Sequence, residues 1–149
     1  MARLPTGVTV VAAPGDDGPV GATVNAVSSL SLDPPLILAC LDRGSRTLAA
    51  IDSASRFGVS VLRAEHAALA RSFASKAPHT EKWSEVAWTA RGDVPILDDA
   101  LAWLTCALRD QHDGGDHVIL TGTILDLDRF DGEPLVFHDG AYRGLGEWG

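Results

Sequence analysis

Short segments rich in β-branched residues, each ended by turn formers, limit what this chain can fold into. Residues 6–12, 20–32 and 36–41 are separated by clusters of Pro, Gly and Asp, which favour tight turns. Residues 20–32 are long enough for one bent strand or for two strands. The segment 57–62 alternates in the manner of a strand. Together these segments predict a mainly β structure.

Two later pairs of segments are predicted to form antiparallel hairpins. The first pair, 101–108 and 118–127, flanks a DGGD sequence, and Asp next to Gly is typical of hairpin turns. The second pair, 135–137 and 141–145, flanks an HDG sequence. Successive hairpins favour a closed or nearly closed antiparallel β-barrel of the Greek-key type over a doubly wound sheet.

Helical periodicity occurs in only two places. Residues 46–54 follow Ser45, a favourable N-cap, and carry Leu48 and Ile51 on one face. Residues 65–74 begin with an acidic residue, as the helix dipole favours. A few short connecting helices fit the predicted barrel.

Length, charge and cysteine content narrow the class of protein. The chain has 149 residues, which predicts one domain spanning 1–149. Its formal net charge of −8 argues against nucleic acid or an anionic membrane as the main partner, because both need a clustered cationic surface. Two cysteines are too few for a disulfide framework. No leader opens the sequence, and the apolar run 36–41 is far too short for a membrane span, so we expect a soluble cytoplasmic protein.

The sequence RGSRT at 43–47 lies where a buried strand gives way to a helix. Backbone N–H groups, two hydroxyls and two guanidinium groups would converge there, which suits a phosphomonoester. The alternative is a capping Ser45 beside solvated arginines. Residues 23–29 are polar but uncharged, which suits the edge of a flat heterocycle or, equally, a Ser/Thr-rich edge strand. No strand–GxGxxG–helix unit is present, so a nicotinamide cofactor would be held without a Rossmann domain.

Residues 72–76 are predicted to close the second helix, with Lys76 in its last turn. Phe73 is either a core anchor or a cover for a ring system, with Ser75 and Lys76 reaching a phosphate or a carbonyl. His117 opens the strand after the DGGD turn and is a candidate for presenting its imidazole to a ligand. Two histidines at this turn leave a metal site short of ligands, so no metal is expected.

The remaining aromatic residues and histidines are interpreted more simply. Trp103 lies in a strand and is predicted to be core, while the other three tryptophans could stack on a ligand. Three histidines are predicted to lie at the surface: His66, His79 and His138.

The stretches LPTGVTVV at 4–11 and GATVNAVSSLSLDPPL at 21–36 resemble the opening of the flavin reductase-like, FMN-binding split-barrel family. Shorter stretches resemble it in the same order: SRT at 45–47, FGVSVL at 57–62, FASK at 73–76, GDH at 115–117 and PLVF at 134–137. The resemblance covers nearly the whole chain. It implies a homodimeric split β-barrel that uses NADH or NADPH to reduce FMN or FAD and releases the reduced flavin to a separate flavin-dependent monooxygenase.

The resemblance also implies which residues contact the ligands. Flavin contacts fall on Gly21, Ala22, Thr23, Asn25, Ala26, Ser28, Cys40, Leu41, Asp42, Ser45, Arg46, Thr47, Phe73, Ala74, Ser75 and Lys76. Nicotinamide-nucleotide contacts fall on His117, Phe137, His138, Asp139, Gly140 and Tyr142. The turn at 137–140 reads FHDG where relatives often have Tyr-Arg, a departure that removes a cation from the nicotinamide contact.

Hydride transfer between the two rings needs no protein nucleophile and no metal, so no catalytic residue is assigned. The expected task of the protein is to stack the rings, with His117 positioning the nicotinamide and hydroxyl groups of Thr23, Ser28 and Ser45 binding the flavin. The alternatives are a flavoprotein that retains FMN and acts directly on a small molecule, a non-catalytic flavin-binding module, and an interaction barrel without a cofactor.

Overall fold

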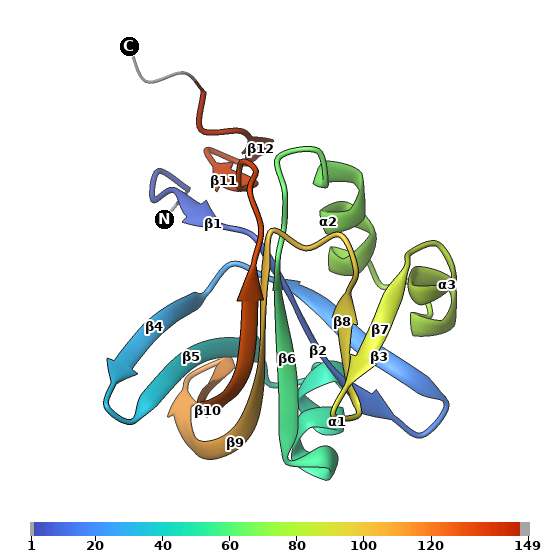
Figure 1. Ribbon diagram of the computed structural model, residues 1–149, viewed down its shortest axis with the longest axis vertical. Coiled ribbons are helices and arrows are strands. Elements are labelled where there is room, and N and C mark those ends of the chain that lie inside the picture. Colours follow the sequence, from blue (N-terminus) through green and yellow to red (C-terminus); the bar gives the residue numbers. More distant parts are fainter. Residues whose placement is uncertain (1, 147–149) are drawn as a thin grey trace.

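Seven strands form one curved antiparallel sheet in the order β3-β2-β6-β9-β10-β5-β4 (Figure 1). The computed structural model describes residues 2–146. The strands of this sheet are β2 (Thr9–Gly15), β3 (Gly18–Val24), β4 (Val27–Leu32), β5 (Pro35–Asp42), β6 (Arg56–Val61), β9 (Ala102–Gly114) and β10 (His117–Arg129). The mainly β, antiparallel fold with few helices is confirmed, and residues 20–32 form two strands.

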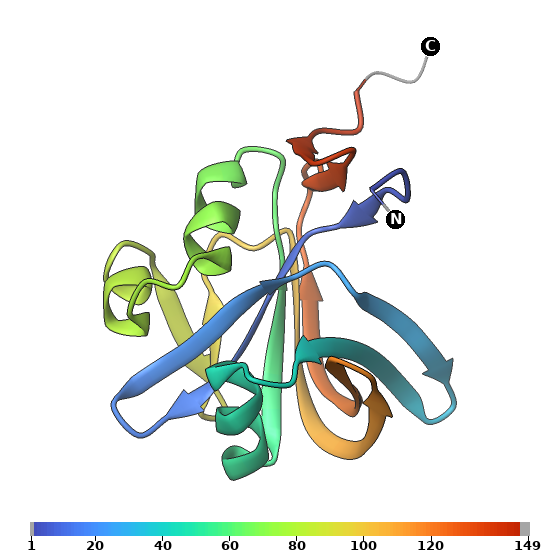
Figure 2. The ribbon, with the colours of Figure 1, turned by 180° about the vertical axis from the view of Figure 1, so that it is seen from behind.

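The connection between β3 and β4 explains why the sheet curls into an open barrel. These two strands lie at opposite edges of the sheet, yet only Asn25 and Ala26 separate them in the chain. A two-residue link can join the two edges only if the sheet bends round until they meet, as Figure 2 shows from behind. A hydrogen bond from Cys40 N to Ala26 O, 2.9 Å, fixes the link to β5.

Three helices and two smaller sheets complete the fold. The helices are α1 (Arg46–Ala54), α2 (Ala67–Ala74) and α3 (His79–Ser84). The smaller sheets contain β1 (Thr6–Gly7) with β11 (Val136–His138) and β12 (Ala141–Arg143), and β7 (Trp88–Arg91) with β8 (Val94–Leu97). The predicted bounds of α1 are confirmed, and α2 begins two residues later than predicted. The expectation of only two helices is wrong, because α3 is a six-residue helix without an apolar periodicity.

β2 is buried on both faces, which explains its continuous run of apolar residues. Val10 and Ala12 belong to a core that also contains residues of α2, α3 and β8. Val11 and Ala13 face the opposite way, into a core that contains Leu48 and Ile51 of α1 and residues of β5 and β10. β2 therefore separates two hydrophobic cores, one against α2, α3 and β8 and the other against α1, β5 and β10.

The burial of individual aromatic residues and histidines agrees with the sequence-based prediction at some positions and contradicts it at others. Trp103 is 5 % exposed, which confirms its predicted place in the core. The prediction that His66 lies at the surface is wrong: its side chain is 12 % exposed and bonds Asp99 through Nε2 at 3.1 Å. His79 is half-buried and is also not a free surface residue. Trp148 lies outside the described residues.

A helix that could cross a membrane and a cluster of metal-binding side chains are both absent from residues 2–146. None of the helices in this range is long and apolar enough to cross a membrane. Across the same range, no cluster of three or more His, Cys, Asp or Glu side chains is arranged to hold a metal ion.

Candidate functional site

A cavity of about 380 Å³ opens where the barrel closes, between β3, β5, the start of α1 and the β11–β12 hairpin. Its lining comes from separate parts of the chain: Ala22, Thr23, Val24, Asn25, Ala26, Cys40, Leu41, Asp42, Ser45, Ala74, His117, Phe137 and Tyr142. All of these except Val24 are predicted site residues. The tertiary structure thus gathers members of both predicted contact sets, flavin and nicotinamide, around one space.

The turn between β5 and α1 brings a helix N-terminus to this cavity. The Asp42 carboxylate accepts a hydrogen bond from Gly44 N at 2.7 Å, and Ser45 N donates to Asp42 O at 3.0 Å. Ser45 Oγ then accepts from Thr47 N at 3.1 Å and from Leu48 N at 3.4 Å. Ser45 is therefore the N-cap of α1, as the simpler interpretation held, and it lines the cavity as well.

Arg43 does not take part in the predicted phosphate site. Its guanidinium group donates from Nε to Gly115 O at 3.0 Å and from Nη2 to His117 O at 3.2 Å, and it also pairs with Asp113. The prediction that two guanidinium groups converge beside Ser45 is therefore wrong. Arg43 instead ties the β9–β10 turn to the start of α1, which brings His117 to the cavity.

His117 is oriented by its neighbour in the turn. Its Nδ1 lies 2.8 Å from Asp116 Oδ1. This hydrogen bond and the charge of the imidazole lower the pKa of the exposed Asp116 carboxyl. The carboxylate on Nδ1 leaves the Nε2 edge of the ring for other partners.

An aromatic pair forms the wall contributed by the C-terminal hairpin. Phe137 and Tyr142 are paired across β11 and β12, with ring centroids 5.2 Å apart and planes inclined by 60°. The Arg71 guanidinium lies 5.3 Å above the Tyr142 ring, a cation–π distance. Burial raises the pKa of the Tyr142 hydroxyl. These contacts hold the two rings in place from α2.

The end of α2 is fixed against the cavity by two contacts. Thr23 Oγ1 donates to Ala70 O at 2.6 Å, which joins β3 to α2. Lys82 of α3 is 4 % exposed, and its Nζ donates to Ser75 O at 2.7 Å. Burial and the charge of Arg46 lower the pKa of the Lys82 ammonium group. Sequence reasoning missed Lys82, since a single lysine in a polar segment carries no signal of burial.

Three predicted flavin residues do not line this cavity. Phe73 is 1 % exposed and packs edge-to-face on Trp83 with ring centroids 5.1 Å apart, so the core interpretation is the right one. Gly21 lies beneath α3, where a Cβ would come 2.9 Å from Trp83 Cζ2. Arg46, although it follows Ser45, lines a different cavity.

The other predicted residues do not line the cavity either. Lys76 follows α2 instead of lying in its last turn, which carries Arg71; that prediction is wrong. Besides Gly21, Arg46, Phe73 and Thr47, six predicted contacts do not line the cavity: Ser28, Ser75, Lys76, His138, Asp139 and Gly140. Thr47 is buried at 1 % exposure, next to the N-cap of α1. The ligand contacts of these residues stay predictions.

The sequence profile described as "Flavin reductase like domain" matches residues 1–146. This chain belongs to the flavin reductase-like family. The reductase component of a 4-nitrophenol 4-monooxygenase/4-nitrocatechol 2-monooxygenase from Rhodococcus opacus is 39 % identical over 142 residues, which cover 95 % of this chain and 76 % of that protein. The FMN reductase (NADH) SmoA of Agrobacterium fabrum is 37 % identical, over 95 % of this chain and 80 % of SmoA.

Solved structures of flavin reductases share the fold. The NADH:FAD oxidoreductase SgcE6 of Streptomyces globisporus superposes with a TM-score of 0.92 at 34 % identity, covering 98 % of this chain and 89 % of that one. The barrel described above is therefore that of the flavin reductase-like family, and the chain is an oxidoreductase.

Two buried oxygens test whether the cavity fits a flavin nucleotide. Asn25 Oδ1 and Thr47 Oγ1 are both buried and have no hydrogen-bond partner among the described residues. An isoalloxazine ring carries an N–H donor for an amide oxygen, and a phosphate accepts from a threonine hydroxyl. Asn25 lines the cavity, and Thr47 lies at the start of α1 next to Ser45. The residues present therefore fit a flavin.

Proposed function

We propose that this flavin reductase binds a flavin and NADH together in the cavity at the barrel closure and supplies the reduced flavin to a separate oxygenase. One observation carries the proposal: residues predicted for the flavin and residues predicted for the nicotinamide nucleotide line the same cavity of about 380 Å³. Hydride transfer requires the two rings to approach within about 3–3.5 Å, and a shared cavity permits this approach.

The flavin would lie along β3 and the start of α1. Asn25 Oδ1 would accept from the ring N–H, while Ser45 and Thr47 would meet the phosphate at the helix N-terminus. A phosphate there would be favoured by the positive end of the α1 dipole. When bound, the flavin supplies the hydride acceptor, and the protein's own residues orient and shield it.

The nicotinamide would enter from the side of the β9–β10 turn. His117, held by Asp116, would contact its carboxamide, and the Phe137–Tyr142 pair would cover the ring. SmoA is named as an FMN reductase (NADH), and SgcE6 is named as an NADH:FAD oxidoreductase. These names, together with the missing cation in the FHDG turn, support NADH over NADPH.

The assembly we propose is a homodimer. β4 is an edge strand with Leu32 90 % exposed, and Leu125 of β10 is 65 % exposed. Leu36 of β5 pairs with Ser31 on one side and with Thr123 on the other, so the two exposed leucines lie on the strands that flank the start of β5. An exposed edge with apolar side chains favours cover by another chain. In the proposed homodimer, a second copy of this chain would cover the exposed edge.

The partner we propose is a flavin-dependent oxygenase, because the R. opacus relative is named as the reductase component of a monooxygenase. Both Cys40 and Cys106 are free thiols, which agrees with a reducing compartment. We place the protein in the cytoplasm, because the proposed reaction needs NADH. We also propose that the chain forms a single domain.

Steady-state oxidation of NADH in the presence of free FMN, FAD or riboflavin tests this function. The expected result is turnover with added flavin and reduced flavin in the filtrate after anaerobic reaction and ultrafiltration. A yellow purified protein that retains one flavin per chain, with no reduced flavin in the filtrate, would favour the retained-flavin enzyme. Binding of flavin without NADH oxidation would show a non-catalytic module.

A further inference from the structure

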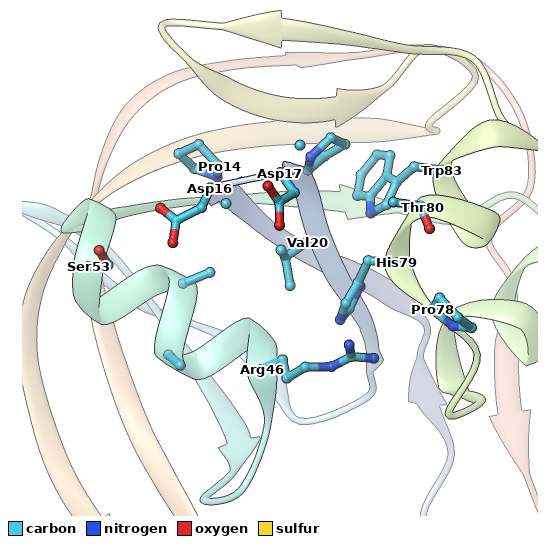
Figure 3. Close-up of a pocket in the computed structure, with 15 residues that line it drawn as sticks. Pro14, Asp16, Asp17, Val20, Arg46, Ser53, Pro78, His79, Thr80 and Trp83 are labelled. Atoms are coloured by element: carbon cyan, nitrogen blue, oxygen red, sulfur yellow. The ribbon is translucent and has the colours of Figure 1, made fainter.

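A second cavity, of about 480 Å³, is lined by residues of β3 and α1, two elements that also line the first cavity (Figure 3). On β3, Ala22 and Thr23 line the first cavity, whereas Val20 lines the second. At the start of α1, Ser45 lines the first cavity and Arg46 the second. The two cavities are therefore neighbours that share β3 and the start of α1 as walls. A ligand phosphate held at Ser45 would lie at the junction between them.

The end of the second cavity nearest this junction carries hydrogen-bond donors and a positive charge. Figure 3 shows the Arg46 and His79 side chains directed toward each other into the space. His79 Nδ1 accepts a hydrogen bond from Gly21 N at 3.3 Å, so its proton is on Nε2 when the ring is neutral. Burial, followed by the charges of Lys82 and Arg46, lowers the pKa of His79 to about 4, which keeps the ring neutral at physiological pH.

The far end of the cavity carries the opposite charge. Asp16 and Asp17, in the turn between β2 and β3, are exposed and line it. Between the two ends, Ala49 of α1 and an edge of Trp83 give the cavity an apolar floor. An anionic group is therefore favoured at Arg46 and repelled from the far end, which instead suits hydroxyl and amino donors.

We infer that the second cavity binds the adenylate half of FAD, with its phosphate at Arg46 and His79 and its ribose and adenine directed toward Asp16 and Asp17. This inference rests on the proposed function, because it extends the flavin beyond the phosphate held at Ser45. An adenylate provides one phosphate, a flat apolar ring for the Ala49 floor, and hydroxyl and amino donors for the carboxylates. The enzyme consequently binds FAD more tightly than FMN.

An adenylate is also part of NADH, and the position of the cavity distinguishes the two sources. The second cavity adjoins the first at the start of α1, where the flavin phosphate would lie. The residues proposed for nicotinamide, His117 and Phe137, belong to the β10 and β11 side of the first cavity. The adenylate next to Arg46 therefore belongs to the flavin.

The test measures dissociation constants of FAD and FMN by fluorescence titration without NADH, so it does not depend on turnover. Ala49→Glu adds a carboxylate to the floor of the second cavity, and the ratio of FAD affinity to FMN affinity is expected to fall about tenfold because the diphosphate is repelled. Arg46→Gln is expected to lower the ratio in the same direction. Ala68→Glu is the matched control: Ala68 is an exposed residue inside α2 and lines neither cavity.

Three outcomes overturn the inference. One is a wild-type protein that binds FAD no more tightly than FMN. Another is an affinity ratio in a folded Ala49→Glu protein equal to that of Ala68→Glu, with folding checked by circular dichroism. The third is a rise in the KM for NADH in Ala49→Glu while the flavin affinity ratio stays constant, which assigns the adenylate to the nicotinamide nucleotide. Each of these leaves the proposed function standing if NADH still reduces free flavin; loss of that activity in the wild type would overturn the proposed function instead.

Discussion

Ser45 and Arg46 are neighbours at the start of α1, yet their side chains line different cavities. Ser45 caps the helix beside Asn25 and His117, whereas Arg46 lies across from His79. Successive residues at a helix start point in different directions, so one turn of chain contributes to two neighbouring cavities. The start of α1 is for this reason the position at which both the flavin proposal and the adenylate inference can be examined.

Replacing Ser45 separates its role as a cap from its role toward phosphate. Ser45→Ala removes the cap and is expected to lower the free energy of unfolding by about 1 kcal/mol, whereas Ser45→Gly costs only a few tenths. Both variants lose the hydroxyl, so both should raise the KM for FMN by about tenfold with little change in kcat at saturation. Urea denaturation and NADH oxidation measure the two effects. An FMN KM that rises only in Ser45→Ala would mean that the hydroxyl acts through helix stability alone.

Removing the imidazole of His117 is expected to affect the nicotinamide side of the reaction. His117→Ala should raise the KM for NADH or slow hydride transfer, because the carboxamide loses a positioning contact. Steady-state kinetics with NADH deuterated at C4 distinguishes these effects, since a slower hydride step exposes a larger isotope effect. His112→Ala, in the exposed part of β9, is the control. A weaker affinity for flavin with normal NADH kinetics would contradict this placement of His117.

The buried position of His79 predicts a loss of stability in acid. Its pKa is about 4 in the folded protein, whereas an unperturbed histidine has a pKa of about 6.5. Between these values the unfolded chain binds a proton that the folded chain does not, so the free energy of unfolding falls as pH is lowered from about 6.5 to about 4. His79→Asn keeps an acceptor for Gly21 N–H but cannot titrate, and should reduce the slope of Tm against pH in this window.

His112→Asn provides the comparison for the acid experiment, because His112 is exposed, lies on β9 and lines neither cavity. Its slope of Tm against pH should match that of the wild type. An unchanged slope in His79→Asn would show that protonation of this ring does not oppose folding.

The proposed dimer predicts that a charge on the exposed edge will separate the subunits. Leu32→Asp replaces a side chain that is 90 % exposed in the single chain, so the fold of the subunit should be retained. Size-exclusion chromatography with light scattering is expected to show a dimer for the wild type and a monomer for the variant. Leu4→Asp, at another exposed leucine, is the matched control. A wild-type monomer, or a variant that remains dimeric, would contradict the proposed interface.

Local sequence was sufficient to predict the position of those elements whose signals lie within a few residues of one another. Ser45 and the spacing of Leu48 and Ile51 located α1, and the DGGD sequence located the turn between β9 and β10. Stretches with family resemblance identified the flavin reductase-like fold and most of the residues around the first cavity. Weak or short signals were missed: α3 has six mostly polar residues, and the β7–β8 hairpin lies in a segment without clear alternation.

The direction in which a side chain points could not be predicted from the sequence. Arg43 and Arg46 both flank the helix cap, but Arg43 holds the β9–β10 turn and Arg46 faces His79. Phe73 and Ala74 are adjacent, yet Phe73 enters the core beside Trp83 and Ala74 faces the cavity. In each pair the partner comes from a distant part of the chain, and local spacing carries no information about it.

The sequence by itself determined the antiparallel β-rich class, the first helix with its cap, and the family. Only the tertiary structure decided that β3 and β4 close the barrel through Asn25 and Ala26. That closure places the residues predicted for the flavin and those predicted for the nicotinamide around one cavity, and a second cavity adjoins it at the start of α1. The physical reason is that strand and helix signals depend on neighbours in the chain, whereas a cavity is formed by packing between segments that are far apart in it.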